Sequence, residues 1–212
     1  MTRATVWMAA LGALLASSAA AQGPAPSAFT VISPIFGQLV TFSLPGSFVT
    51  VFENTNGPNY IREAVLKGET VRSWTQMITV TGVKGAASNA KASPESFAAS
   101  MVGGFKSACP DSFVAQGFGP TKFGDQDAYV AVASCGRVES SADKHSEIAL
   151  IVTVKGSTDY YTLQWAERAP AAARSAIDEA KWLARLRQLQ PIRLCPIVPG
   201  EPAPYPSCAS KG

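Results

Sequence analysis

The residue types in this sequence that are best suited to chemistry are four cysteines and one histidine. The cysteines are Cys109, Cys135, Cys195 and Cys208. None of them forms a C-x-x-C motif, and the lone histidine, His145, adds little to a metal-binding set, so a zinc or redox site has weak support. An even number of cysteines in an oxidising compartment is typical of disulfides. We therefore expect structural cross-links.

Four cysteines allow three pairings, and their positions along the chain favour one of them. We predict disulfides between Cys109 and Cys135 and between Cys195 and Cys208, because each pair brackets a single local unit. The second bond would also attach a proline-rich tail that has no other obvious anchor.

Residues that could act in catalysis are sparse and lack a motif. His145 lies in the polar run 140–146, where a histidine is usually solvated. The residues of a Ser-His-Asp triad can lie far apart in the sequence, so their spacing does not exclude a triad. However, the G-x-S-x-G elbow that exposes a serine nucleophile is missing. Asp125 and Asp127 lack the glycine and the distal glutamate of a calcium loop, and a turn before a strand explains them better. We predict no catalytic residue, no metal ligand and no cofactor.

Residues 1–21 have the pattern of a secretory signal peptide. Arg3 supplies a basic start, an apolar run covers residues 6–16, and residues 19–21 are Ala-Ala-Ala, an A-x-A cleavage site. The apolar run is about half of the roughly twenty residues that a membrane-spanning helix needs. We expect cleavage after Ala21 and no membrane-spanning segment in the mature chain. The compact, alanine-rich signal favours the periplasm, with secretion as the alternative.

The charge balance is nearly even, with 18 Lys and Arg residues against 15 Asp and Glu residues. Apart from Arg185, Arg187 and Arg193, the basic residues are scattered, whereas a nucleic-acid surface needs them clustered. We therefore expect no nucleic-acid partner.

Strands and two helices must position these residues. Alternating apolar and polar residues predict eight strands. The strands cover residues 38–44, 48–52, 60–66, 74–83, 112–118, 128–135, 147–154 and 159–166. Ser93, Pro94 and Glu95 supply a helix N-cap, a first-turn proline and an acidic first turn. They predict a helix that ends near Ala108.

Two glycines, Gly103 and Gly104, interrupt this helix, and we attribute them to close approach of the helix to a strand. A second helix is predicted from Ala169 to about Gln190, where Pro191 stops it.

These elements predict an α+β fold in which two main helices cover an antiparallel β-sheet. The order along the chain is four strands, a helix, four strands and a helix. We divide the chain into a signal peptide (1–21), an extended lead-in (22–37), a single α+β domain (38–190) and a Pro-rich tail closed by a disulfide (191–212).

Three segments of the domain carry a family resemblance. Residues 40–48 read VTFSLPGSF, residues 74–80 read WTQMITV, and residues 93–97 read SPESF. Together they resemble the PsbP-like superfamily, which includes small bacterial envelope proteins of the DcrB type, over roughly residues 38–190. The resemblance implies a helix-covered antiparallel sheet and an accessory, partner-binding role, with no catalytic motif to carry over. The cysteines and the proline-rich tail depart from the family's pattern.

The sequence thus favours a non-catalytic exported protein that binds an envelope protein partner or a small ligand. One alternative is a hydrolase whose site is built from residues remote in sequence, which a pocket joining His145 to a serine and an acid would favour. Another is a surface-association protein that uses the proline-rich tail, which an ordered, packed tail would weaken.

Overall fold

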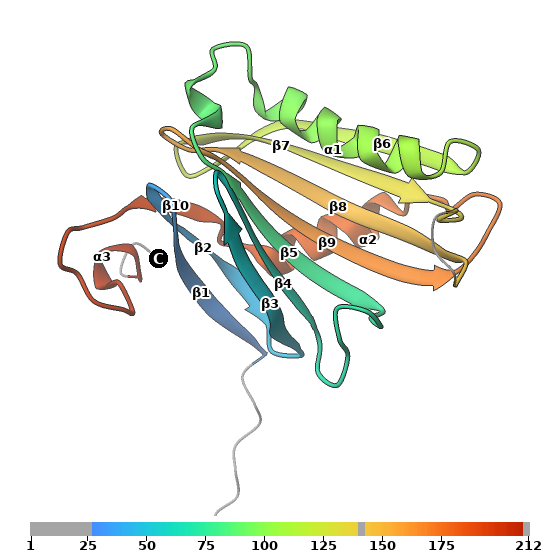
Figure 1. The fold of residues 1–212 in the computed structure, drawn as a ribbon, viewed down its shortest axis with the longest axis horizontal. Coiled ribbons are helices and arrows are strands. Elements are labelled where there is room, and N and C mark those ends of the chain that lie inside the picture. The colour runs from blue at the N-terminus through green and yellow to red at the C-terminus, as the bar shows by residue number, and fades with distance from the viewer. Residues whose placement is uncertain (1–26, 140–142, 210–212) are drawn as a thin grey trace, which may run out of the picture.

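The structure is a computed structural model that describes residues 27–139 and 143–209 (Figure 1). The predicted signal peptide lies outside the described residues. The chain forms an α+β fold of antiparallel strands and a few helices. In chain order the elements are β1 (Ala28–Ile35), β2 (Gln38–Pro45), β3 (Phe48–Asn56), β4 (Asn59–Leu66), β5 (Gln76–Val83), a 3-10 turn (Ala86–Ser88), α1 (Pro94–Ala108), β6 (Phe113–Phe123), β7 (Gln126–Cys135), β8 (His145–Lys155), β9 (Tyr160–Pro170), α2 (Glu179–Leu189), β10 (Arg193–Pro196) and α3 (Pro206–Ala209).

The strands form two separate sheets. A seven-stranded sheet has the order β3-β4-β5-β9-β8-β7-β6, and a three-stranded sheet has the order β1-β2-β10. Each of the eight predicted strands is present, with its ends shifted by a few residues. The prediction of one sheet was incomplete, because β2 pairs with β1 and β10, two strands that the sequence pattern did not reveal.

Strand β1 lies in the segment 22–37, which was predicted to be a lead-in outside the domain. It pairs with β2 along its whole length, and Ile35 is only 1% exposed in the main core. Pro34 makes the segment look unsuited to a sheet, but β1 is an edge strand, where a missing N–H group is tolerated. The folded unit therefore begins before Gln38, which corrects the predicted boundary.

The described part of the C-terminal tail packs on the domain at β10 and around Cys208, whereas residues 196–200 and 202–204 between these points are exposed. Strand β10 pairs with the edge of β2 that β1 leaves free. The predicted disulfide between Cys195 and Cys208 joins β10 to α3, and Tyr205 packs beside it with Leu39.

Helix α2 begins later than predicted. Strand β9 continues to Pro170, which pairs with His145 at the start of β8. The helix N-cap is Asp178, whose side chain accepts a hydrogen bond from the main-chain N–H of Lys181 at 3.1 Å. Pro170 therefore ends a strand and does not open the helix.

Helix α1 forms within its predicted bounds. Ser93 caps it, and the side chain of Ser96 completes a capping box by accepting from the Ser93 N–H. The predicted disulfide between Cys109 and Cys135 then ties the helix C-terminus to the end of β7.

The two longer helices lie on opposite faces of the seven-stranded sheet (Figure 1). Helix α2 and the three-stranded sheet pack on one face, around a core that includes Phe42, Trp165 and Trp182. Helix α1 packs on the other face, mainly over β6, β7 and β8. On the α1 side, β3, β4, β5 and β9 therefore present side chains beyond the cover of the helix.

Candidate functional site

A row of paired side chains leads out from under α1 to the edge of the sheet. Ile151 packs beneath the helix and pairs with Gln164, which pairs with Thr79, then Glu63, then Phe52. Residues that pair across antiparallel strands lie on the same face of a sheet. The uncovered half of this face thus carries an amide, a hydroxyl, a carboxylate and an aromatic ring in succession.

Two adjoining pockets follow the uncovered edge of α1. The first has a volume of about 310 Å³ and is lined by residues that include Met101, Gly104, Phe105, Ala108, Glu147 and Gln164. The second has a volume of about 400 Å³ and is lined by residues that include Asn54, Ile61, Thr81, Val83, Phe97 and Met101. Because Met101 lines both, we call them together the α1 groove.

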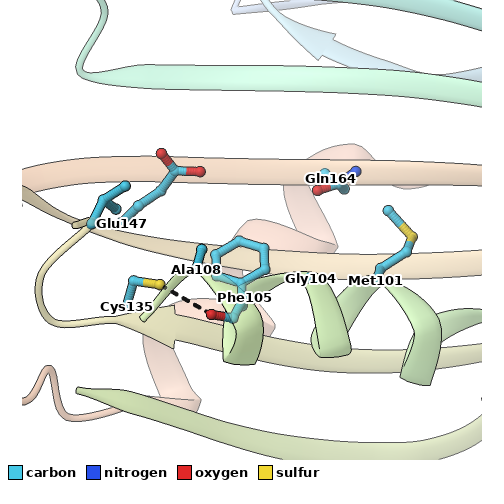
Figure 2. A pocket seen from close by; sticks show the side chains of 8 residues that line it. Met101, Gly104, Phe105, Ala108, Cys135, Glu147 and Gln164 are labelled. Atoms are coloured by element: carbon cyan, nitrogen blue, oxygen red, sulfur yellow. Dashed lines mark hydrogen bonds between the residues drawn. The ribbon is translucent and has the colours of Figure 1, made fainter. Parts of the chain in front are cut away.

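The wall of the α1 groove is apolar, and its floor is partly polar. Figure 2 shows Met101 and Phe105 projecting from α1 toward the strand that carries Gln164, with Gly104 between them on the helix. On the floor, the hydroxyl oxygens of Thr81 and Thr162 lie 2.5 Å apart in a hydrogen bond. Apolar lining with a few polar groups is typical of ligand sites.

The glycines of α1 are not explained by packing. A Cβ atom added at Gly103 or at Gly104 would meet no atom within 4 Å. The sequence-based explanation, close approach to a strand, was therefore wrong. Glycine destabilises a helix interior by roughly 0.5–1 kcal/mol relative to alanine, so the pair weakens α1 without a steric need. At Gly104 the missing side chain leaves space in the first pocket.

Glu63 is a half-buried carboxylate beside the groove, on the part of the sheet face that α1 leaves uncovered. Burial raises the pKa of its carboxyl group. Within residues 27–139 and 143–209, no hydrogen bond or ion pair reaches its side chain. Glu147, at the other end of the groove, is instead held by Arg168, whose Nε donates to Glu147 Oε2 at 3.1 Å.

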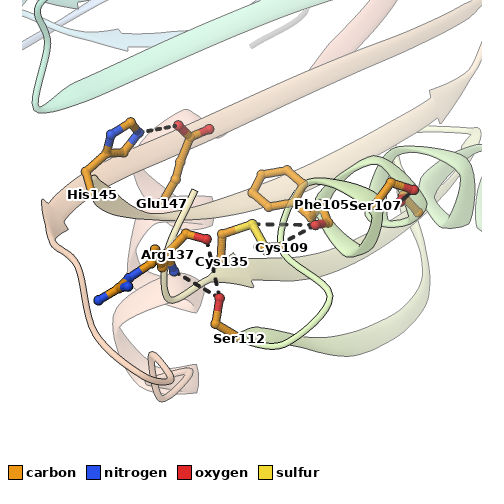
Figure 3. The surroundings of a disulfide bond; sticks show 9 residues. Phe105, Ser107, Cys109, Ser112, Cys135, Arg137, His145 and Glu147 are labelled. Atoms are coloured by element: carbon orange, nitrogen blue, oxygen red, sulfur yellow. Dashed lines mark hydrogen bonds and ion pairs between the residues drawn. A yellow bond between two sulfur atoms is a disulfide. The ribbon is translucent and has the colours of Figure 1, made fainter. Parts of the chain in front are cut away.

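His145 is more enclosed than its polar surroundings in the sequence suggested. It is the first residue of β8, and its side chain is 16% exposed. Nδ1 lies 2.7 Å from the main-chain oxygen of Asp143. Nε2 lies 3.7 Å from Glu147 Oε2 (Figure 3). The prediction of a solvated loop histidine was wrong, because pairing with Pro170 extends the strand into the polar run.

A third pocket, of about 380 Å³, brings His145 near a serine and an acid, Ser73 and Asp143. The groups are not arranged as a triad. Asp143 contacts the ring through its main-chain oxygen, and no hydrogen bond joins Ser73 to His145 in the part of the chain that the structure describes. The guanidinium of Arg168 instead stacks over the ring of Trp74 at 3.7 Å.

The disulfide residues occupy structural positions. Cys109 and Cys135 lie beside the main chain of Phe105 at the end of α1 (Figure 3), and Cys135 lines the first pocket. Among the described residues, no group of three or more His, Cys, Asp or Glu side chains could hold a metal ion. The same residues include no helix that is long and apolar enough to cross a membrane.

The polar residues on the uncovered half of the sheet were not singled out from the sequence. Strand alternation places Glu63, Thr79 and Gln164 on one face, but it does not tell which face a helix leaves uncovered. The available clue was the glycine pair Gly103 and Gly104 within an otherwise well-formed amphipathic helix.

No family model matches this sequence, and no curated protein matches it. A crystal structure of a protein from Bacteroides thetaiotaomicron VPI-5482 is similar with a TM-score of 0.40 and 10% sequence identity, over 78% of this chain and 47% of that chain. This chain therefore spans about half the length of that protein.

Proposed function

We propose that this chain is a non-catalytic, exported protein of the PsbP-like type that binds a protein partner or small ligand of the cell envelope in the α1 groove. The A-x-A pattern before residue 22 and the two disulfides support export. The antiparallel sheet with helices on both faces is compatible with the family resemblance.

Gly104 of α1 carries the binding proposal. Gly103 and Gly104 weaken the helix, and no neighbouring atom requires either of them. Gly104 lines the first pocket, where any larger side chain would fill space between Met101 and Phe105. At Gly104, the need to keep the groove open explains a cost in helix stability that has no packing reason.

The chemistry of the groove suits recognition better than catalysis. Phe97, Met101 and Phe105 form an adaptable apolar wall, since methionine fits partners of different shape. The floor offers the amide of Gln164 and the hydroxyl of Thr81 for orientation. Among the described groove residues, no nucleophile is hydrogen-bonded to a general base, which covalent catalysis would need.

The test compares leucine at the two adjacent glycines. Gly104→Leu places a side chain in the first pocket, whereas Gly103→Leu places the same side chain where the helix borders neither pocket of the groove. We expect Gly104→Leu to lower partner recovery at least about tenfold and Gly103→Leu to leave it unchanged. The readout is affinity capture from the cell envelope with mass spectrometry, and thermal unfolding checks that both variants fold. Equal recovery with both variants would contradict the proposal.

A further inference from the structure

We infer that the occupant of the α1 groove is an extended polypeptide segment of a partner protein that carries a lysine or arginine, and that Glu63 binds this cation. The inference rests on the proposed function, because it specifies what the groove binds. Four observations lead to it: the position of Glu63, its lack of a partner, the ring beside it, and the length and polarity of the groove.

Glu63 lies beside the two pockets of the groove, on the uncovered half of the same sheet face. Across the sheet it pairs with Thr79, whose other partner, Gln164, lines the first pocket. Along β4 it is two residues from Ile61, which points to the same face and lines the second pocket. A ligand that lies in the second pocket and continues along β4 past Ile61 therefore reaches the Glu63 carboxylate.

The charge of Glu63 is uncompensated within the described residues. Two other glutamates on this sheet have cationic partners: Glu147 has Arg168, and Glu167 has Lys181 and Arg185. A third, Glu53, accepts a hydrogen bond from the Tyr60 hydroxyl. A carboxylate that is partly removed from water without a partner is unfavourable, and burial accordingly raises the pKa of Glu63. A cation supplied by a ligand would satisfy the carboxylate where the fold does not.

An exposed aromatic ring stands next to this carboxylate. Phe52 pairs with Glu63 on β3 and is 42% exposed. The bulge between Thr50 and Phe52 places Phe52, and not Val51, opposite Glu63. Lysine and arginine side chains pack their methylene stems and their charge against aromatic rings. Carboxylate and ring together form a site suited to such a side chain.

The dimensions and polarity of the groove favour a polypeptide over a lipid. Helix α1 has 15 residues, which corresponds to about 22 Å, or about seven residues of extended chain. An extended segment alternates its side chains, so that apolar ones can contact Met101 and Phe105 while polar groups face Thr79 and Gln164. An acyl chain would leave these floor groups without hydrogen bonds, which is unfavourable.

The test is site-specific photo-cross-linking of the full chain inside the cells that produce it. Benzoylphenylalanine replaces Asn54, which lines the second pocket, or Thr55, the next residue of β3, which points to the opposite face. We expect a cross-linked partner from position 54 and none from position 55. The cross-linked segment is expected to contain a lysine or arginine when its sequence is determined.

The charge dependence is tested in the same cells. Glu63→Gln keeps the shape of the side chain but removes its charge, and Asp125→Asn removes an equal charge from an exposed hairpin turn outside the groove. Glu63→Gln is expected to lower the cross-linking yield from position 54 about tenfold, as loss of a charge-assisted hydrogen bond implies. Asp125→Asn is expected to leave the yield unchanged.

The outcomes separate this inference from the proposed function. An unchanged yield with Glu63→Gln, or a cross-linked segment without lysine or arginine, overturns the inference and leaves the groove as a binding site. No cross-link from position 54 in the otherwise unaltered chain overturns the proposed function itself. Thermal unfolding of Glu63→Gln verifies the fold, and a stability at or above that of the parent is expected because a half-buried charge is removed.

Discussion

Asp159 is a buried carboxylate that joins segments far apart in the chain. Its oxygens accept hydrogen bonds from the N–H groups of Gly37 and Gly85 at 3.1 and 2.7 Å, and from the Tyr161 hydroxyl at 3.2 Å. Gly37 lies in the turn between β1 and β2, and Gly85 follows β5. The carboxylate therefore connects the three-stranded sheet to the seven-stranded sheet.

Replacing this carboxylate is expected to destabilise the protein. Asp159→Asn leaves one acceptor oxygen where two are used, so at least one N–H or O–H group loses its partner. We expect the free energy of unfolding to fall by about 1.5–3 kcal/mol, the range for hydrogen bonds to a charged group. Denaturant unfolding measures the change, with Asp125→Asn as an exposed control expected to stay within about 0.5 kcal/mol. An equal, small effect of both variants would show that Asp159 is not a connecting residue.

The effect of Asp159 should also depend on pH. Burial alone would raise its pKa, but the hydrogen bonds from Gly85, Gly37 and Tyr161 outweigh burial and hold the pKa below its ordinary value. A lowered pKa contributes stability that is complete above the unfolded-state pKa of about 3.9 and is lost as the pH falls through the folded-state pKa. The stability difference between the parent and Asp159→Asn should therefore narrow below about pH 4. Unfolding curves from pH 7 to pH 2.5 measure it, and a constant difference would contradict the assignment.

For individual residues, the sequence predicts a role correctly where that role depends on residues nearby in the chain. The cysteine pairs follow from their position along the chain, because each bond closes one local unit. The surroundings of His145 and Glu63 could not be predicted, because they depend on β9 and on the placement of α1. Such contacts join residues distant in sequence and leave no local pattern.

Single elements were predictable where local signals determine their ends. Ser93, Pro94 and Ser96 define the start of α1 through capping, which acts within one turn. Pro170 gives a similar helix-start pattern, but pairing with β8 keeps that segment in a strand. Pro34 argues against a strand, yet the edge position of β1 accommodates it. Non-local pairing decided the outcome at both prolines.

Helix α1 should gain stability when its glycines are replaced. Gly103→Ala adds a methyl group that meets no atom within 4 Å, and it reduces the conformational freedom of the unfolded chain. We expect the free energy of unfolding to rise by about 0.5–1 kcal/mol. Chemical denaturation measures this, with helix content from circular dichroism as a check. A loss of stability would mean that the helix does approach another segment at this position.

For the whole molecule, composition and strand spacing predicted an antiparallel α+β fold, but not its division into two sheets. Strand β2 pairs with β1 and with β10, which lie near opposite ends of the described chain. Only burial of the shared core, with Phe42 and Trp182 between the layers, makes this arrangement favourable. Because the three-stranded sheet and α2 pack on one face of the large sheet, only α1 covers the other face. Half of that face therefore stays uncovered, and the groove lies along the edge of α1.

The two disulfides should contribute similarly to stability but differently to binding. They close loops with sequence separations of 26 and 13 residues. Constraint of the unfolded chain would then contribute about 3.5 and about 2.9 kcal/mol respectively. Paired replacement of Cys109 and Cys135 by alanine, or of Cys195 and Cys208 by alanine, should therefore lower the free energy of unfolding by comparable amounts in denaturant.

Binding distinguishes the two replacements. The bond between Cys109 and Cys135 anchors the C-terminal end of α1, and Cys135 lines the first pocket. The bond between Cys195 and Cys208 lies in the tail, with Leu39 and Tyr205. At a temperature where both variants remain folded, we expect cross-linking from position 54 to fall only when Cys109 and Cys135 are replaced. An equal fall in the cross-linking yield with both replacements would contradict this prediction. It would show that binding depends on the stability of the whole molecule and not on the anchoring of α1.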